Sequence, residues 1–259
     1  MTRLEGRRAV VTGGSRGIGR AIAAALAEAG ASVAIVARGA DALESAAAAM
    51  RRDGSRVVAV RCDVTDRRQV ADLPAHVRAA VGDPDVLVNN AGGADTHKLL
   101  DHPDDLWERM LRLNLTSVYW VTKALLPSLV ASGRGRLINV ASTAAKSGAR
   151  YAAAYAAAKH GVLGLTRSLA LELAASAVTV NAVCPGYADT PMTAESIERI
   201  VARSGRSADD ARRALESTSP QGRLIRAEEV AALVCFLAGD AAAGITGQAI
   251  NVDGGAVMS

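Results

Sequence analysis

Apolar residues are grouped along this chain in two alternating patterns. Short runs rich in Val, Ile and Ala, such as SVAIVA and RVVAVR, are typical of strands that are buried on both faces. Between them lie Ala-rich stretches whose pattern indicates helices. We expect seven strands, at residues 7–12, 32–37, 56–61, 85–90, 135–142, 177–183 and 248–254. We expect six main helices, near residues 17–29, 41–53, 66–81, 104–131, 152–175 and 227–238. The alternation predicts an α/β fold in which helices cover both faces of a parallel sheet.

The domain organisation follows from the continuity of this pattern. No Pro- or Ser-rich linker divides the 259 residues, so we expect a single domain over residues 1–259. One long excursion, residues 187–226, separates the sixth strand from the last helix. Such excursions are typically functional, and we interpret this one as a helical lid over a substrate, in preference to a solvated pair of surface helices.

Composition narrows the class of protein. Half of the residues are hydrophobic but only 3% are aromatic, so the core must be aliphatic. The net charge of +4 is spread along the chain, which suits an anionic ligand but does not indicate nucleic-acid binding. The three cysteines, Cys62, Cys184 and Cys235, lie far apart, without the spacing of metal ligands or of a disulfide framework.

The N-terminal sequence and the apolar stretches lead us to expect a cytoplasmic location. The start MTRLEGRRAVVTGG has no apolar region typical of a signal peptide. The most apolar long stretch, residues 151–175, carries Lys159, Arg167 and Glu172, so we do not expect it to span a membrane.

A glycine-rich segment, TGGSRGIG at 12–19, lies between the first strand and the first helix. Gly13, Gly17 and Gly19 would let the backbone turn tightly and approach a pyrophosphate at the helix N-terminus. The spacing differs from G-x-G-x-x-G, and a plain turn is the alternative.

The end of the second strand suggests which dinucleotide would bind. An acidic residue there would favour a free ribose 2′-hydroxyl, but the sequence has Ala37 followed by Arg38. Arg16 lies in the glycine loop, and two guanidiniums suit a 2′-phosphate. We therefore expect NADPH/NADP+ rather than NAD(H), the alternative being two ordinary surface arginines.

Tyr155 and Lys159 interrupt an Ala-rich helix four residues apart, which places them on one face. They are either ordinary surface residues or a catalytic pair. In such a pair the tyrosine donates a proton, and the lysine ammonium lowers the pKa of the tyrosine. Tyr151 is a second tyrosine four residues earlier.

Several motifs occur together in one order along nearly the whole chain. They are TGGSRGIG at 12–19, CDV at 62–64, NNAG at 89–92, Asn114 in LNLTS, Ser142 in NVAST, YAAAK at 155–159 and VCPGYADT at 183–190. The chain thereby resembles the short-chain dehydrogenase/reductase family. It looks closest to β-ketoacyl-thioester (3-oxoacyl) reductases and aromatic polyketide ketoreductases.

This resemblance implies a doubly wound, Rossmann-type, seven-stranded parallel sheet. It also implies a homotetramer, since relatives are commonly tetramers that pair the helices corresponding to 104–131 and 152–175. It implies that Asp63 and Val64 contact adenine, that Asn90, Ala91 and Gly92 follow the adenine ribose, and that Pro185, Gly186 and Thr190 surround the nicotinamide. The full expected cofactor set is Gly13, Ser15, Arg16, Gly17, Ile18, Gly19, Arg38, Asp63, Val64, Asn90, Ala91, Gly92, Tyr155, Lys159, Pro185, Gly186 and Thr190.

The expected catalytic group is Asn114, Ser142, Tyr155 and Lys159. Tyr155 would donate the proton and Ser142 would hold the carbonyl oxygen. By resemblance, Lys159 also binds the nicotinamide ribose and Asn114 orders a relay water.

We expect reduction of a small-molecule carbonyl, such as a 3-oxoacyl thioester or related ketone. The alternatives are an NAD-dependent secondary-alcohol or 3-hydroxyacyl dehydrogenase working oxidatively, and a dinucleotide-binding regulator without activity. No metal is expected.

Overall fold

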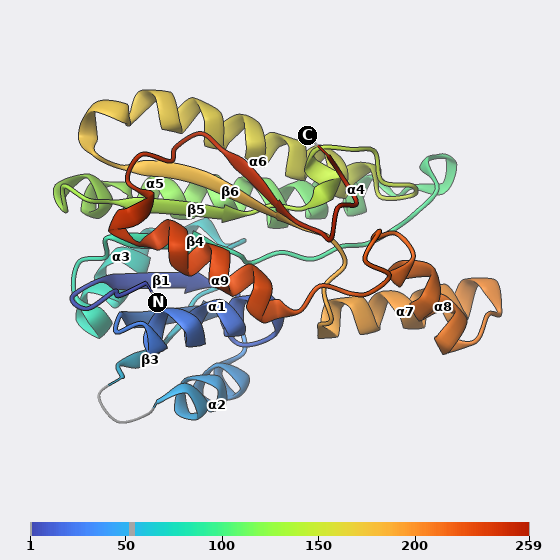
Figure 1. Cartoon of the computed structure of the whole chain (residues 1–259), viewed down its shortest axis with the longest axis horizontal. Coiled ribbons are helices and arrows are strands. Elements are labelled where there is room, and N and C mark those ends of the chain that lie inside the picture. The colour runs from blue at the N-terminus through green and yellow to red at the C-terminus, as the bar shows by residue number, and fades with distance from the viewer. Residues whose placement is uncertain (1, 52–54, 259) are drawn as a thin grey trace.

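A computed structural model of the chain describes residues 2–51 and 55–258 (Figure 1). Its seven strands form one parallel sheet in the order β3-β2-β1-β4-β5-β6-β7. The strands are β1 Arg8–Thr12, β2 Ser32–Ala37, β3 Val57–Arg61, β4 Val86–Asn89, β5 Arg136–Val140, β6 Thr179–Pro185 and β7 Ala249–Val252. The predicted doubly wound seven-stranded sheet is therefore confirmed.

The helices follow the predicted order, with differences at the boundaries. They are α1 Gly17–Glu28, α2 Ala40–Met50, α3 Arg67–Val81, α4 Asp104–Leu111, α5 Ser117–Ala131, α6 Ala153–Glu172, α7 Pro191–Ser204, α8 Ala208–Glu216 and α9 Ala227–Ala238. The helix predicted over 41–53 ends at Met50, and residues 52–54 lie outside the described part of the chain. The single helix predicted over 104–131 is divided by a π-helical turn, Arg112–Thr116.

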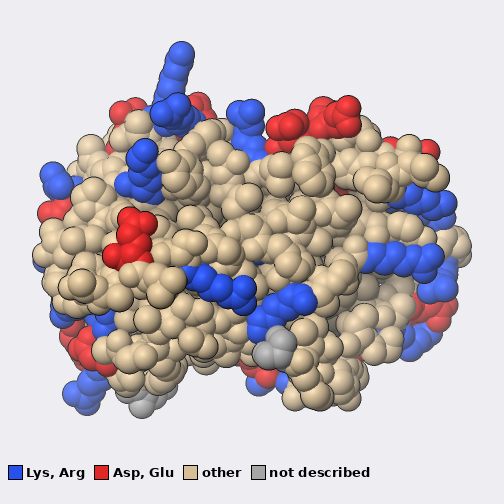
Figure 2. All heavy atoms as spheres, turned by 90° about the horizontal axis from the view of Figure 1, so that it is seen from above, with Lys and Arg blue, Asp and Glu red and all other residues tan. Residues whose placement is uncertain are grey.

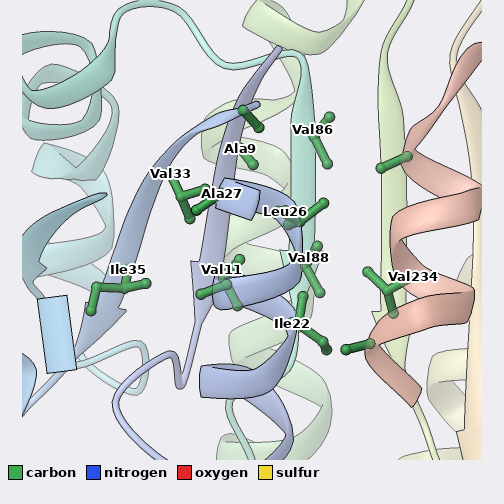
Figure 3. Close-up of a cluster of buried hydrophobic side chains, with 14 of the residues drawn as sticks. Ala9, Val11, Ile22, Leu26, Ala27, Val33, Ile35, Val86, Val88 and Val234 are labelled. Carbon is green, nitrogen blue, oxygen red and sulfur yellow. The ribbon is translucent and has the colours of Figure 1, made fainter. Parts of the chain in front are cut away.

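Two aliphatic cores hold the helices on opposite faces of the sheet. On one face α1, α2 and α9 contribute buried Ala, Leu, Ile and Val side chains. Ile22 and Leu26 of α1 lie over Val11 and Val88 of the sheet, with Val234 of α9 beside them (Figure 3). On the other face the core comes from α3, α5 and α6. Burying both faces explains why the strands read as continuous apolar runs.

The strand order reverses between β1 and β4, which are neighbours in the sheet although two strands and three helices separate them in sequence. In open α/β sheets, ligands bind at such a reversal, beyond the carboxyl ends of the strands. The glycine loop follows β1, the NNAG motif begins at Asn89, the last residue of β4, and Ser142 follows β5. The fold thus gathers the predicted motifs at one edge of the sheet.

The excursion over residues 187–226 contains α7 and α8, which pack together and project past the carboxyl edge (Figure 1). Its two ends are joined by a short parallel bridge. The Ile225 N–H donates to the Tyr187 carbonyl at 2.8 Å, and the Asp189 N–H donates to the Ile225 carbonyl at 2.8 Å. The segment is therefore a helical flap with a fixed base, and its role as a substrate lid stays a prediction.

Charged side chains on the face shown in Figure 2 are scattered, with wide uncharged areas between basic and acidic residues. On this face no single-sign block is visible of the kind that nucleic-acid binding surfaces show. Among the described helices, none combines the length and the apolar character that crossing a membrane requires.

Candidate active site

The glycine loop after β1 is shaped largely by contacts within the protein. Gly13 and Gly17 have φ values of +67° and +55°, in the left-handed region that favours glycine. The Asn90 side-chain Nδ2 donates to the carbonyl oxygens of Thr12 at 3.0 Å and Gly13 at 3.2 Å. A Cβ on Gly19 would overlap both the Gly13 carbonyl and the Asn90 amide. Gly19 is thus required because the Gly13 carbonyl and the Asn90 amide that binds it occupy the space of a side chain, a role that the sequence analysis did not assign to either residue.

Thr12 is a further structural residue that the sequence analysis missed. Its buried Oγ1 accepts hydrogen bonds from the backbone N–H groups of Asn90 and Ala91, each at 3.0 Å. The only sequence signal was its position as the first residue of TGGSRGIG. Thr12 and Asn90 together fix the segments after β1 and β4 to each other.

The N-terminus of α1 is open to a ligand. Arg16 is its N-cap residue, in an extended conformation, and no side chain caps the first-turn N–H groups. Unpaired N–H groups and the helix dipole favour a negatively charged group at this point. Ser15, Gly17 and Ile18 lie here, as a pyrophosphate site requires.

The two arginines expected to hold a 2′-phosphate differ in their surroundings. Arg38 directly follows β2, is exposed, and has no side-chain hydrogen bond or ion pair within the described residues. Arg16 is already engaged: its Nη1 lies 2.8 Å from Oε1 of Glu195 on α7. Glu195 was not among the predicted site residues, because an ion pair between residues so far apart in sequence has no local signal.

The predicted adenine contacts lie after β3. Asp63 Oδ1 accepts hydrogen bonds from the Thr65 N–H at 2.9 Å and the Thr65 hydroxyl at 2.7 Å, which fixes this turn. Val64 is buried. Their contact with adenine stays a prediction.

Tyr155 and Lys159 occupy the first two turns of α6, on one face as predicted. The Lys159 Nζ lies 5.8 Å from the centroid of the Tyr155 ring and donates to the Val140 carbonyl at 2.8 Å. Lys159 is only 4% exposed, and burial lowers its pKa to about 8. Tyr151 lies outside α6 with a φ of +65° and does not share this face.

The pKa of Tyr155 differs from the sequence-based expectation. We expected Lys159 to lower it, but burial raises the pKa of Tyr155 above its usual value. A hydrogen bond with the Ser142 hydroxyl acts in the opposite direction and only partly offsets burial. Ser142 Oγ also accepts from the Ala144 N–H at 3.1 Å, which leaves its own proton free to be donated.

Asn114 is fully buried in the π-helical turn between α4 and α5. Its Nδ2 donates to the carbonyls of Gly93 at 3.0 Å and Met110 at 3.1 Å, and its Oδ1 accepts from the Gly93 N–H at 3.1 Å. A Cβ on Gly92 would lie 2.8 Å from that Oδ1 and 3.7 Å from the Lys159 Nζ. The side-chain amide therefore braces the segment after β4, next to Lys159.

The residues expected around a nicotinamide lie after β6. The Gly186 N–H donates to the Val252 carbonyl at 3.0 Å. Thr190 is the N-cap residue of α7, and a Cβ on Gly17 would lie 3.5 Å from the Thr190 Cβ. The base of the flap therefore lies against the glycine loop.

Two features fit a nicotinamide dinucleotide across this edge. The first turn of α1 offers uncapped N–H groups to the phosphates. The buried Lys159 ammonium has three donors, of which the structure pairs one, with the Val140 carbonyl. The other two would be satisfied by hydroxyls such as those of a ribose. Within the described residues, no group of three His, Cys, Asp or Glu side chains is arranged to hold a metal ion.

Comparison with known proteins agrees with this arrangement. Residues 7–200 match the family described as short chain dehydrogenase, so the chain belongs to the short-chain dehydrogenase/reductase family and is an oxidoreductase. It is 40% identical over 256 residues to a 3-oxoacyl-(acyl-carrier-protein) reductase of Pseudomonas aeruginosa, covering 99% of each chain. It is 45% identical over 252 residues to a cis-4-hydroxycyclohexanecarboxylate dehydrogenase of Sinomonas cyclohexanicum, covering 96% of each.

Among solved structures, a variant of actinorhodin polyketide ketoreductase with NADPH is similar over 99% of both chains, with a TM-score of 0.93 and 40% identity. The family expected from the sequence motifs is thus confirmed, and polyketide ketoreductases and 3-oxoacyl reductases are among the relatives, as expected.

Proposed function

We propose that this protein reduces the ketone of a 3-oxoacyl thioester or a related small-molecule carbonyl compound, with NADPH as the hydride donor. The observation that carries the proposal is the Ser142–Tyr155 hydroxyl pair at the carboxyl end of β5, beside the buried Lys159 ammonium. The similarity to a 3-oxoacyl-(acyl-carrier-protein) reductase and to a polyketide ketoreductase supports this choice of substrate class.

Bound NADPH would supply the hydride, and the chain's own residues would handle the oxygen and the proton. The Ser142 hydroxyl, held by the Ala144 N–H, donates a hydrogen bond to the ketone oxygen. Tyr155 transfers its phenolic proton to that oxygen as negative charge develops. The Lys159 ammonium then stabilises the resulting phenolate, helped by the N-terminus of α6. Asn114 keeps the segment after β4 in place through Gly93.

The protonation state of Tyr155 is compatible with the reductive direction. A tyrosine with its usual pKa is protonated at neutral pH, as an acid for ketone reduction must be, and burial raises the pKa of Tyr155 further. Alcohol oxidation would need the phenolate as a base. The oxidative alternative is nevertheless supported by the similarity to the Sinomonas dehydrogenase, and it would use the same four residues.

Arg38 supports the choice of NADPH, since it is exposed, without a partner in the described structure, and follows β2 where no acidic side chain stands.

The proposal includes a homotetramer that pairs α4, α5 and α6, and a cytoplasmic location. The three cysteines are free, which is consistent with a reducing compartment.

The test is to mix the protein with acetoacetyl-CoA and a panel of simple ketones, with NADPH or NADH, and to follow loss of cofactor absorbance. We expect NADPH to be consumed with at least one 3-oxo substrate. Oxidation of alcohols with NAD, without ketone reduction, would instead favour the dehydrogenase. Tight cofactor binding without any turnover would indicate a regulator.

A further inference from the structure

The Arg16–Glu195 ion pair joins two parts of the cofactor site that the proposed function uses separately. Arg16 belongs to the glycine loop at the N-terminus of α1, whereas Glu195 lies in the second turn of the flap helix α7. Their Nη1 and Oε1 atoms are 2.8 Å apart, and the two side chains are 63% and 45% exposed. Within the part of the chain that the structure describes, Glu195 is the one side-chain partner of Arg16.

The backbone positions make this pairing more than a chance encounter of surface side chains. The start of α7 lies against the glycine loop, since a Cβ on Gly17 would be 3.5 Å from the Thr190 Cβ and 3.9 Å from the Pro191 Cδ. Glu195 therefore projects from a helix whose first residues contact the residue next to Arg16. The carboxylate is held close to the guanidinium by the base of the flap.

A dinucleotide phosphate bound by Arg16 would meet this carboxylate. One guanidinium can make its best bidentate bonds to only one anion at a time, and two anions that share it repel each other. Arg38, in contrast, has no carboxylate partner within the described residues. Of the two arginines, only Arg16 must exchange or share a partner when a phosphate arrives.

We propose that Glu195 is a cofactor-specificity residue that competes with the 2′-phosphate of NADPH for Arg16 and so reduces the preference for NADPH over NADH. The proposal rests on the proposed function only in taking NADPH as the cofactor. It assigns a role in cofactor choice to the flap, in addition to its predicted role over the substrate. NADH lacks the 2′-phosphate, so its affinity should not depend on Glu195.

The experiment measures dissociation constants for NADPH and NADH by direct titration, without substrate, in wild type and in Glu195→Gln. An exposed ion pair contributes little, so we expect NADPH to bind about two- to fivefold more tightly to the variant, and NADH binding to be unchanged. The gain should shrink at high salt, because surface charges are screened. Glu198→Gln is the matched control, since Glu198 is an exposed glutamate on the same helix without an ion pair in the described structure.

The double variant completes the test. In an Arg16→Ala background, Glu195→Gln should no longer change NADPH affinity. The inference is overturned if Glu195→Gln and Glu198→Gln have equal effects, if both cofactors respond alike, or if the gain persists without Arg16. These outcomes differ from failure of the proposed function, which the turnover assay detects as the absence of ketone reduction. The titrations use no substrate, so a wild type without turnover would leave the comparison of Glu195→Gln with Glu198→Gln intact.

Discussion

Lys159 and Arg16 both bring positive charge to the carboxyl edge of the sheet, in opposite surroundings. Lys159 is 4% exposed and donates to a strand carbonyl, that of Val140. Arg16 is 63% exposed and pairs with Glu195, which belongs to the flap. The catalytic centre around Lys159 is thus anchored to a buried backbone carbonyl. Arg16 and Arg38, which form the rim where the cofactor would be selected, are instead exposed side chains.

This difference sets how each region should respond to change. A donor fixed by buried backbone is already oriented before any ligand binds, and its removal cannot be compensated by solvent. An exposed ion pair exchanges partners at small cost and is screened by salt. We therefore expect large, salt-insensitive effects at Ser142, Tyr155 and Lys159, and small, salt-sensitive effects at the rim.

The largest effect should come from Tyr155→Phe, which removes the proton donor and leaves the ring. We expect the rate of ketone reduction to fall by ~10²–10⁴-fold. NADPH affinity should change little, since the ring is retained. Steady-state rates and NADPH titration check this, and Tyr151→Phe is the matched control outside α6. Wild-type turnover by Tyr155→Phe would show that another group is the acid.

A smaller change is expected from Arg38→Asp at the rim. The new carboxylate would repel the 2′-phosphate and could accept hydrogen bonds from the ribose hydroxyls of NADH. Loss of one charged hydrogen-bonding partner costs about 1.5–3 kcal/mol, so NADPH should bind roughly tenfold or more weakly. Dissociation constants for both cofactors measure the switch.

Arg20→Asp is the control for this variant, because it makes the same charge change at an exposed position on α1. If the two variants lose the same NADPH affinity, Arg38 has no specific role and only the overall charge matters. If wild type binds NADH as tightly as NADPH, Arg38 is an ordinary surface residue.

The buried ammonium should also be visible in stability. The pKa of Lys159 is about 8 in the folded chain, below its usual value near 10.5. Between these pH values the unfolded chain binds more protons, so the folded state gains stability as pH rises. Relative to Lys159→Met, the wild-type free energy of unfolding should increase by about 1 kcal/mol from pH 8 to pH 9.

Denaturant unfolding of the cofactor-free proteins at several pH values tests this, and the comparison between variants cancels groups that both share. The pKa of Tyr155 is raised above 10, so its titration lies outside this interval. Parallel stability curves for the two proteins would mean that the lysine titrates as if it were exposed.

The smallest effect is expected where the flap meets the loop after β4. Arg203 Nη1 donates to the Thr96 carbonyl at 2.6 Å and to the Thr96 hydroxyl at 3.1 Å. Since this contact is exposed, Arg203→Ala should lower the free energy of local opening of α7 by at most about 1 kcal/mol. The amide protons of α7 should then exchange up to about fivefold faster. Arg206→Ala is the control. Equal exchange in the two variants would show that this contact does not hold the flap.

Hydrogen exchange also tests the lid itself. We expect residues 187–226 to be better protected with NADPH and a bound ketone than without ligands. Equal protection in both states would leave the flap as a static surface element.

Much of the fold could be predicted because its signals are local. The β-branched runs, the alanine helices and the glycine turns are each determined by neighbouring residues, and the parallel sheet then gathers the motifs at one edge. The π-helical turn, the bonds from Asn114 to Gly93 and the Arg16–Glu195 pair could not be predicted, because they depend on which distant segments meet. The pKa of Tyr155 was predicted in the wrong direction, because burial is a property of the folded chain.

The close packing of Gly19 has a consequence for how this chain can vary over evolution. The glycine loop and the NNAG motif are far apart in sequence, yet the space that a Cβ at position 19 would need is taken by the Gly13 carbonyl and the Asn90 amide. A shorter side chain at position 90 would not make room by itself, because the Gly13 carbonyl would still block it. Gly19 is therefore fixed by the backbone of its own loop as well as by the NNAG motif, so a change at position 90 alone would not let a larger residue replace it.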